Sequence, residues 1–283
     1  MPTPQLISGL AEVADRYDAV LSDVWGVIHN GRESFAEAVE ALQRFKDTRG
    51  PVILISNAPR PAAAVLPQLD ELGVPRSAWS AFVTSGDATR AELKKRAPGP
   101  VWAIGPERDR PLYEGIELEF AGPEEAKFIS VTGPYDDEVD RPEDYLERLS
   151  GPASRKLPMI CANPDRVVQR GDKLIYCAGS IADVYEELGG PVMMAGKPFA
   201  PIYDLACEEA AREAGRRVSK VLAIGDAIPT DVKGANNQEI DCLFVARGIH
   251  AADLASPLDA EDVAALLARE GGRAAYAVPE LRW

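Results

Sequence analysis

Residues 17–31 read YDAVLSDVWGVIHNG, and the rest of the chain is organised around this stretch. Val20 and Leu21 lie in a short apolar run that predicts a buried strand ending at Asp23, and small, turn-prone residues follow at once. In an α/β protein, the carboxyl ends of parallel strands border the crevice in which ligands bind. Asp23 is therefore a candidate catalytic residue, although a carboxylate at this point can also simply cap or turn the chain.

A second strand, over residues 52–55, follows a well-signalled helix over residues 34–50. A strand, a helix and a strand in this order form a parallel pair whose carboxyl ends meet at one edge of the sheet. Ser56 and Asn57 should therefore lie beside Asp23. A hydroxyl and an amide just past a strand suit the binding of an anion, although Ser56 can also be an ordinary helix N-cap.

Further periodic stretches extend this alternation of strands and helices. The helix over 34–50 should open with a capping box of Ser34 and Glu37, and we interpret Asp87 as a helix cap. Other helices are expected over 6–17, 62–74, 180–190 and 259–272. Strands are expected over 101–105, 128–133, 158–165, 221–224 and 240–248, with an edge strand at 274–278.

The chain is long enough for two domains. It has 283 residues, of which 46% are hydrophobic, enough to bury a sizeable core. A Pro-Gly-Pro stretch at 98–100 is a plausible linker, and three short strands recur beyond it. We expect an α/β fold in which residues 1–97 and 191–283 form a Rossmann-like core with a doubly wound parallel sheet, and residues 98–190 form an inserted, smaller α/β domain.

Composition limits the partners and the location of the protein. The formal net charge of -14 argues against nucleic acid and anionic membrane surfaces, because both would repel it. No apolar run approaches membrane-spanning length and no leader is apparent, so the cytoplasm is the expected location. The four cysteines are widely spaced, without metal-ligand spacing, and are expected to be reduced and mostly buried.

Two later segments bring charged side chains to the same edge of the predicted sheet. Lys197 precedes a Pro-started helix, and the strand over 221–224 runs into Asp226, with Asp231 beginning a short helix. Two carboxylates from separate strands, without a histidine cluster, favour a hard cation such as Mg²⁺. A lysine and a hydroxyl would then orient a phosphoryl group, and in-line attack by the Asp23 carboxylate on phosphorus is the chemistry that fits.

Four motifs follow one another at domain-scale spacing: DVWGV (23–27), LISNA (54–58), GKP (196–198) and IGDAIPTD (224–231). In this order they resemble the haloacid dehalogenase-like hydrolase superfamily. The insertion, with CANPD and AGSIADVYEELGG, is similar to the class IIA branch with its C2 cap domain. That branch contains phosphatases of sugar phosphates, nitrophenyl phosphate and pyridoxal phosphate, and the resemblance spans nearly the whole chain.

The resemblance implies a role for each charged residue of the motifs. It makes Asp23 the nucleophile and a metal ligand, and the main-chain carbonyl of Trp25 a second ligand. Asp226 would complete the metal site, and Asp231 would support the metal site or the lysine. Lys197 would pair with the nucleophile and the phosphate.

The resemblance also implies substrate contacts. Ser56 and the amide of Asn57 would hold the phosphoryl oxygens. Asn163 and Asp165 lie in a cap-linked stretch that faces the active site in class IIA relatives. Of the other residues around this stretch, Trp102 and Tyr176 are expected in the core of the inserted domain, and Arg166 at its surface.

Trp25 departs from the family pattern. Phosphatases of the superfamily usually carry a second aspartate here, which protonates the leaving oxygen. The Trp25 carbonyl can bind metal, but the indole cannot carry a proton, and general acid–base catalysis is worth about 10²–10⁴ in rate. An alkyl phosphate should react slowly, whereas an acyl or aryl phosphate needs no such acid. His29 is the nearest titratable candidate for the missing group, but a packing or surface role is favoured for it.

The sequence thus predicts a Mg²⁺-dependent phosphohydrolase that acts on a small phosphorylated metabolite through an aspartyl phosphate. A catalytically weak phosphometabolite-binding protein that lacks the acid is the alternative. Cleavage of a carbon–halogen or carbon–phosphorus bond also tolerates the missing aspartate, but dehalogenation needs no metal, whereas Asp226 and Asp231 suggest one. The resemblance further implies a homodimer, since class IIA relatives often pair through the cap domain.

Overall fold

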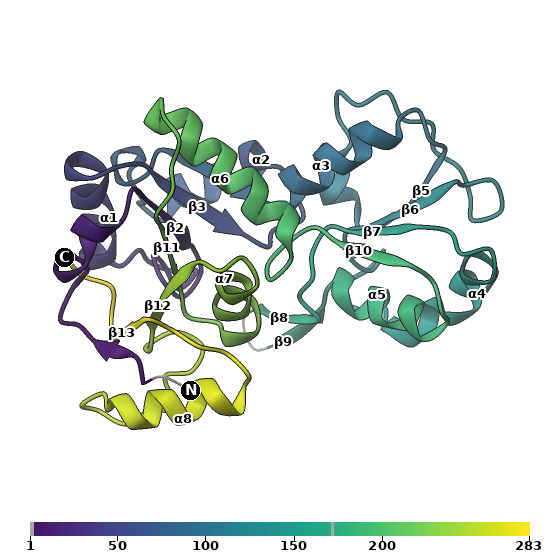
Figure 1. The fold of residues 1–283 in the computed structure, drawn as a ribbon. Coiled ribbons are helices and arrows are strands. Elements are labelled where there is room, and N and C mark those ends of the chain that lie inside the picture. Colours follow the sequence, from purple (N-terminus) through teal and green to yellow (C-terminus); the bar gives the residue numbers. More distant parts are fainter. Residues whose placement is uncertain (1–2, 171–172) are drawn as a thin grey trace. The chain divides into compact units, whose positions relative to one another are not determined.

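The computed structural model describes residues 3–170 and 173–283, and the chain divides into two compact units (Figure 1). The core unit comprises the chain up to Ser56, Leu66–Val83 and Lys197–Trp283. The inserted unit comprises Asn57–Val65 and Thr84–Gly196. The domain boundaries proposed from the sequence, with 98–190 as the insertion, stay a prediction.

The core unit is built on a seven-stranded sheet in the order β1-β13-β12-β11-β2-β3-β4. The pairs from β1 across to β3 all run parallel. The predicted α/β fold is therefore confirmed. The strands are β1 (Gln5–Leu6), β2 (Ala19–Asp23), β3 (Val52–Ser56), β4 (Ala81–Thr84), β11 (Val221–Gly225), β12 (Asp241–Val245) and β13 (Tyr276–Val278).

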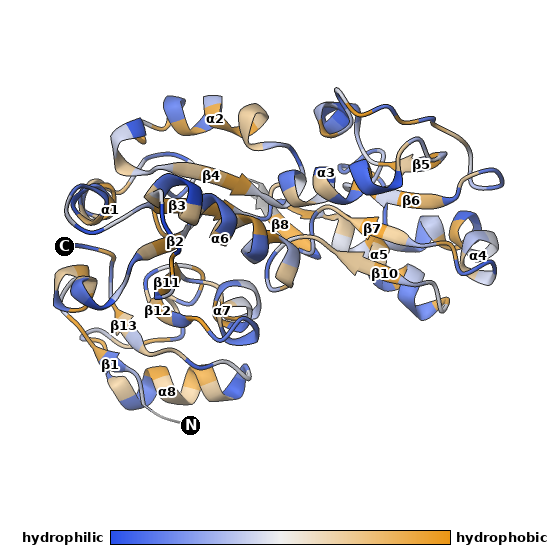
Figure 2. Ribbon diagram, turned by 45° about the horizontal axis from the view of Figure 1, so that its top comes forward, coloured by the Kyte–Doolittle hydropathy of each residue, from blue (hydrophilic) through white to orange (hydrophobic). Residues whose placement is uncertain are grey.

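Helices pack apolar side chains onto this sheet. Phe45 of α1 is fully buried, and Val263 and Leu266 of α8 join the same cluster as Phe244 of β12. Figure 2 shows the central strands as hydrophobic, as expected for strands covered on both faces. The helices are α1 (Ala36–Thr48), α6 (Ala200–Ala214), α7 (Lys233–Asn237), α8 (Ala260–Arg269) and α2 (Ala62–Glu71), which begins in the inserted unit; short helical turns are η1 (Leu10–Glu12), η2 (Ala14–Arg16), η3 (Arg76–Ala78) and η6 (Ile228–Val232).

The inserted unit has its own parallel sheet, in the order β10-β7-β6-β5, and a separate antiparallel pair, β8 and β9. Trp102 is buried in its core, as predicted, and donates to the Tyr135 hydroxyl. The elements are β5 (Val101–Ile104), β6 (Phe128–Val131), β7 (Met159–Cys161), β8 (Val167–Arg170), β9 (Lys173–Tyr176), β10 (Val192–Met194), α3 (Ser85–Arg96), α4 (Leu146–Ser154), α5 (Ala178–Glu187), η4 (Glu107–Leu112) and η5 (Pro142–Tyr145).

The core assignment of Tyr176 is wrong, because its side chain is 38% exposed. Tyr176 lies on β9, where side chains alternate between two faces of a two-stranded ribbon. Ile175 points inward and is buried, whereas Leu174 and Tyr176 point outward. The core assignment did not take into account that this segment pairs, among the described strands, with β8 alone, which leaves one of its faces exposed.

The amphipathic helix expected over residues 6–17 does not form. Strand β1 and the two short turns η1 and η2 occupy this stretch. Leu10 is fully buried, and its amide donates to the carbonyl of Arg282. A Cβ on Gly9 would lie 2.4 Å from the carbonyl oxygen of Trp283. Packing against the C-terminal residues therefore overrides the helical spacing of the apolar side chains.

Two other structural details differ from those predicted from the sequence. Helix α1 begins after Phe35, without a side-chain cap, so the capping box of Ser34 and Glu37 is wrong. The amide of Phe35 donates instead to the carbonyl of Ile28, at 2.7 Å. Strand β13 is not an edge strand, because it lies between β1 and β12.

Other expectations about single residues are confirmed. The Asp87 carboxylate accepts from the Thr84 and Ala62 amides, as its helix-cap assignment predicted. All four cysteines are free, and three of them are buried.

Within residues 3–170 and 173–283, no helix is both long and apolar enough to span a bilayer.

Candidate active site

Three strand ends of the core unit meet at one edge of its sheet. Strand β2 ends at Asp23, which lies opposite Ile55 of β3, so the half-buried Ser56 follows at the same edge. On the other side of β2, Ile224 of β11 lies opposite Ser22, and Asp226 follows the end of β11. The parallel order of the strands thus assembles residues that are far apart in the sequence.

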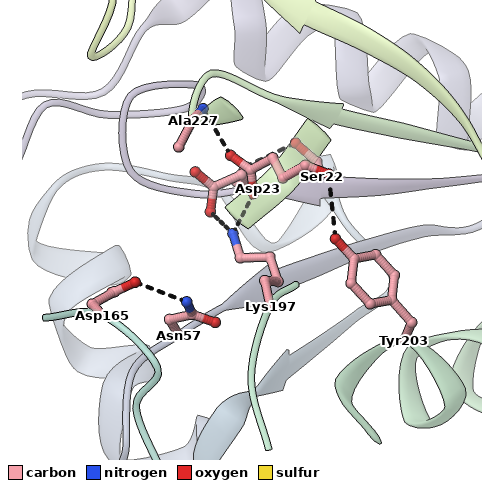
Figure 3. Close-up of polar contacts among 8 residues, drawn as sticks. Ser22, Asp23, Asn57, Asp165, Lys197, Tyr203 and Ala227 are labelled. Carbon is pink, nitrogen blue, oxygen red and sulfur yellow. Dashed lines mark hydrogen bonds and ion pairs between the residues drawn. The ribbon is translucent and has the colours of Figure 1, made fainter. Parts of the chain in front are cut away.

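The carboxylates of Asp23, Asp226 and Asp231 form a buried cluster. Each offers an oxygen, and these oxygens lie within 4.8 Å of one another. Lys197 is 3% exposed, and its Nζ donates to Oδ1 of Asp23 and to Oδ1 of Asp231, both at 2.6 Å (Figure 3). A buried ammonium is tolerated only when it is paired in this way.

The charges in this cluster do not balance. Burial, reinforced by the charge of Asp231, raises the pKa of Asp23 well above its ordinary value. Burial and the charge of Asp231 also raise the pKa of Asp226, to about 6. Burial alone would lower the pKa of Lys197, but Asp23 and Asp231 together raise it. Three carboxylates facing one ammonium form an all-oxygen, electron-rich donor set that fits a hard divalent cation.

Two glycines make room for the carboxylate of Asp226. Gly26 has a φ of +83°, and a Cβ at this position would lie 2.2 Å from Oδ2 of Asp226. A Cβ on Gly248 would lie 1.8 Å from the same oxygen, which also accepts from the Ile249 amide at 2.7 Å. Neither Gly248 nor Ile249 was predicted from the sequence as part of the site. The available signal was a glycine at the end of the strand predicted over 240–248, the next strand after the IGDAIPTD motif.

Asp231 is held by its own turn and by a neighbouring helix. Its Oδ2 accepts from the Ala227 amide at 3.1 Å, and its amide donates to the Ala227 carbonyl at 2.8 Å, within η6. The hydroxyl of Tyr203, buried on α6, donates to the Asp231 carbonyl at 3.5 Å. Tyr203 was missed, because a tyrosine on the inner stripe of a helix is indistinguishable from ordinary packing.

Trp25 lies in the loop after Asp23, and its indole is 55% exposed. It packs edge-on against His29, with ring centroids 5.3 Å apart. His29 is buried, its Nδ1 accepts from the Gly31 amide at 3.0 Å, and burial lowers its pKa. His29 therefore has the packing role that the sequence analysis favoured, and a lowered pKa makes it a poor proton donor at neutral pH.

The predicted residues of the inserted unit come together with one another. Nδ2 of Asn57 donates to Oδ1 of Asp165, and the Asp165 amide donates to Oδ1 of Asn163, both at 3.0 Å (Figure 3 shows the first of these). Arg166 is exposed, as predicted, and its guanidinium pairs with Asp183 at 2.8 Å.

Comparisons with known proteins identify the family. Residues 20–119 match the haloacid dehalogenase-like hydrolase model, and residues 194–269 match a second model of HAD-hydrolase-like proteins. A crystal structure of a hydrolase of the haloacid dehalogenase-like family from Brucella suis 1330 is 44% identical, with a TM-score of 0.83, over 98% of this chain and 100% of that one. The chain is a haloacid dehalogenase-like hydrolase. The family predicted from the four motifs is thereby confirmed, and the protein is an enzyme.

Two other relatives of this haloacid dehalogenase-like hydrolase are named as a nucleotidase and as a phosphatase. The 5'-nucleotidase YutF of Bacillus subtilis (strain 168) is 29% identical over 82% of this chain and 88% of that protein. A crystal structure of a glycerol phosphate phosphatase from Mycobacterium tuberculosis in complex with magnesium is 24% identical, with a TM-score of 0.66, over 84% of this chain and 70% of that one. The latter likeness shows a shared fold.

Proposed function

We propose that this hydrolase is a Mg²⁺-dependent phosphatase that removes the phosphoryl group of a small phosphorylated metabolite through an aspartyl phosphate at Asp23. The observation that carries the proposal is the buried cluster of Asp23, Asp226 and Asp231, in which one lysine, Lys197, pairs with Asp23 and Asp231. Such a cluster combines a nucleophile, a cation site and a positive charge for phosphate. The names of the two relatives, a nucleotidase and a glycerol phosphate phosphatase, support a phosphate monoester as the substrate.

The donor set fits Mg²⁺, which prefers carboxylate and carbonyl oxygens together with water. The carboxylates of Asp23 and Asp226 and the main-chain carbonyl of Trp25 would hold the ion, with Asp231 as a supporting group. When bound, Mg²⁺ supplies charge neutralisation for the phosphoryl oxygens and the attacking carboxylate. Magnesium in a structurally related phosphatase supports this choice of ion.

The chain's own side chains account for the covalent step. A carboxylate oxygen of Asp23 attacks phosphorus, and the bond from phosphorus to the leaving oxygen breaks; the leaving oxygen keeps the electron pair and takes a proton from solvent. Water then attacks the phosphorus of the aspartyl phosphate, which releases phosphate and restores the carboxylate. Lys197, held between Asp23 and Asp231, would neutralise charge on the phosphoryl group, and the Ser56 hydroxyl and the main-chain amide of Asn57 would orient its oxygens.

We also propose residues that bind the substrate outside the phosphoryl site. We propose Asn163 and Asp165 as substrate-binding residues. This expectation comes from the resemblance to class IIA relatives. A homodimer, a cytoplasmic location and the absence of nucleic-acid binding also stay predictions of the sequence.

A phosphometabolite-binding protein without useful turnover is the second candidate. The observation that favours it is the Trp25 side chain, which occupies the position of the usual proton donor and cannot ionise. Burial also lowers the pKa of the neighbouring His29, which disfavours this imidazole as a proton donor at neutral pH.

Chelation of divalent metal is expected to remove phosphate release. A bound divalent ion contributes several kcal/mol to charge stabilisation, so EDTA should lower the rate by about 10²-fold or more, and added Mg²⁺ should restore it. The measurement is steady-state phosphate release from acyl, aryl and alkyl phosphates with and without Mg²⁺. Turnover that persists in EDTA would contradict the metal-dependent mechanism, and tight binding of these compounds without turnover would favour the binding protein.

A further inference from the structure

The segment that follows β3 is fastened inside the inserted unit by the side chain of Asn57. This side chain is only 7% exposed, and its Nδ2 donates to Oδ1 of Asp165 at 3.0 Å (Figure 3). A carboxylate only accepts hydrogen bonds, so it fixes which end of the Asn57 amide faces it. A hydrogen bond to a charged acceptor is also stronger than one between neutral groups.

Asp165 is itself fixed by its neighbours in the chain. Its amide donates to Oδ1 of Asn163 at 3.0 Å, and its carbonyl accepts from the Gly179 amide at 3.1 Å. A Cβ on Gly179 would lie 2.3 Å from the Pro164 carbonyl oxygen, so the backbones of these segments are in direct contact. The backbone of Asp165, whose side chain accepts the hydrogen bond from Asn57, is therefore held by contacts on both sides.

Gly196, the last residue of the inserted unit, lies close to the side chain of Asn57. A Cβ on Gly196 would lie 2.5 Å from Oδ1 of Asn57, 2.7 Å from Cδ of Pro164 and 2.7 Å from Oγ of Ser85. Only glycine lets the backbone approach this closely. We use the name clamp for Asn57, Asp165 and Gly196 together.

The chain neighbours of the clamp are two residues of the proposed active site. Asn57 directly follows Ser56, and Gly196 directly precedes Lys197. A trans peptide bond fixes the distance between neighbouring Cα atoms at about 3.8 Å, so a displacement of Asn57 or Gly196 is passed on to Ser56 or Lys197 unless rotation about φ and ψ compensates for it. In a catalytic site, a displacement of about 1 Å can cost on the order of 10²-fold in rate.

We infer that Asp165 is a positioning residue, which acts through Asn57 to set where Ser56 and Lys197 are held. The hydrogen bond orients the Ser56–Asn57 peptide, whose amide we place at the phosphoryl oxygens. The same orientation of the Asn57 side chain presents Oδ1 to Gly196 and so fixes the peptide that leads to Lys197. This inference rests on the proposed function for its effect on catalysis, but the clamp itself does not.

An exchange of the two side chains tests the inference. Asn57→Asp alone places two carboxylates against each other, and we expect kcat to fall by about 10²-fold, the cost of a displaced catalytic group. In the double variant Asn57→Asp with Asp165→Asn, the side chain at 165 becomes the donor and the side chain at 57 becomes the acceptor. Its kcat should be about tenfold or more above that of the single variant. Asp183→Asn, which breaks the exposed pair with Arg166, is the matched control and should leave kcat within about twofold.

Hydrogen–deuterium exchange of the same variants gives a readout that needs no substrate. Peptides covering residues 52–60 and 193–199 should exchange faster in Asn57→Asp and return towards the natural rate in the double variant, with thermal melting as the check of folding. If the exchange pattern holds but the natural protein releases no phosphate, the clamp stands and the proposed function fails. If phosphate is released but neither kcat nor exchange recovers in the double variant, the positioning role of Asp165 is overturned.

Discussion

Replacement of Asp23 by asparagine is expected to abolish phosphate release, with kcat falling on the order of 10⁴-fold or more, as for the loss of a nucleophile in other enzymes. An amide has the shape of the carboxylate and can still accept from Lys197, but it cannot attack phosphorus. The fall should be seen in kcat for an aryl phosphate such as 4-nitrophenyl phosphate, with saturating Mg²⁺.

The matched control is Asp47→Asn, an exposed aspartate on α1, which should leave kcat unchanged. Thermal melting of both variants verifies the fold. Incubation with substrate, a rapid acid quench and mass spectrometry should find a phosphoryl group on Asp23 in the natural protein and none in Asp23→Asn. Turnover by Asp23→Asn at a rate close to that of the natural protein would rule out covalent catalysis by this residue.

Replacement of Trp25 by aspartate is expected to raise hydrolysis of alkyl phosphates by about 10²-fold, within the range of general acid–base catalysis. The new carboxyl group can protonate the leaving oxygen, which the indole cannot. The gain should be much smaller for an aryl phosphate with a good leaving group, because that oxygen leaves without a proton. The measurement is kcat/KM for one alkyl and one aryl phosphate.

Trp25→Asn is the control for the Trp25→Asp variant, since it removes the indole and matches aspartate in size without supplying a proton. The indole is more than half exposed, so we expect its removal to change the free energy of unfolding by less than about 2 kcal/mol. Equal alkyl-phosphate rates in the Asp and Asn variants would show that the missing acid is not what limits the natural protein.

The arrangement of the candidate site follows largely from the sequence pattern. Strands that alternate with helices pair in parallel, so the carboxyl ends of the apolar runs before Asp23, Ser56 and Asp226 had to meet at one edge. Side-chain types then indicated a cation site and a phosphate site. This inference needed only local periodicity and a general rule of connection.

Contacts between distant segments could not be read in the same way. The helical spacing of Leu10 and its neighbours is real, but packing of Gly9 against Trp283 decides the conformation. The Asn57–Asp165 hydrogen bond and the fit of Gly248 against Asp226 likewise join residues whose sequence neighbourhoods give no sign of each other. Such contacts depend on where whole elements lie, which periodicity does not specify.

Diffraction from crystals grown with Mg²⁺ and beryllium fluoride, a phosphoryl mimic, would show whether Asp23 and Asp226 share one ion and whether Asp23 is the nucleophile. We expect Mg²⁺ at about 2.1 Å from carboxylate oxygens of Asp23 and Asp226 and from the Trp25 carbonyl, with the mimic attached to Asp23. An ion bound away from the pair of Asp23 and Asp226, or a mimic attached elsewhere, would contradict the proposed mechanism.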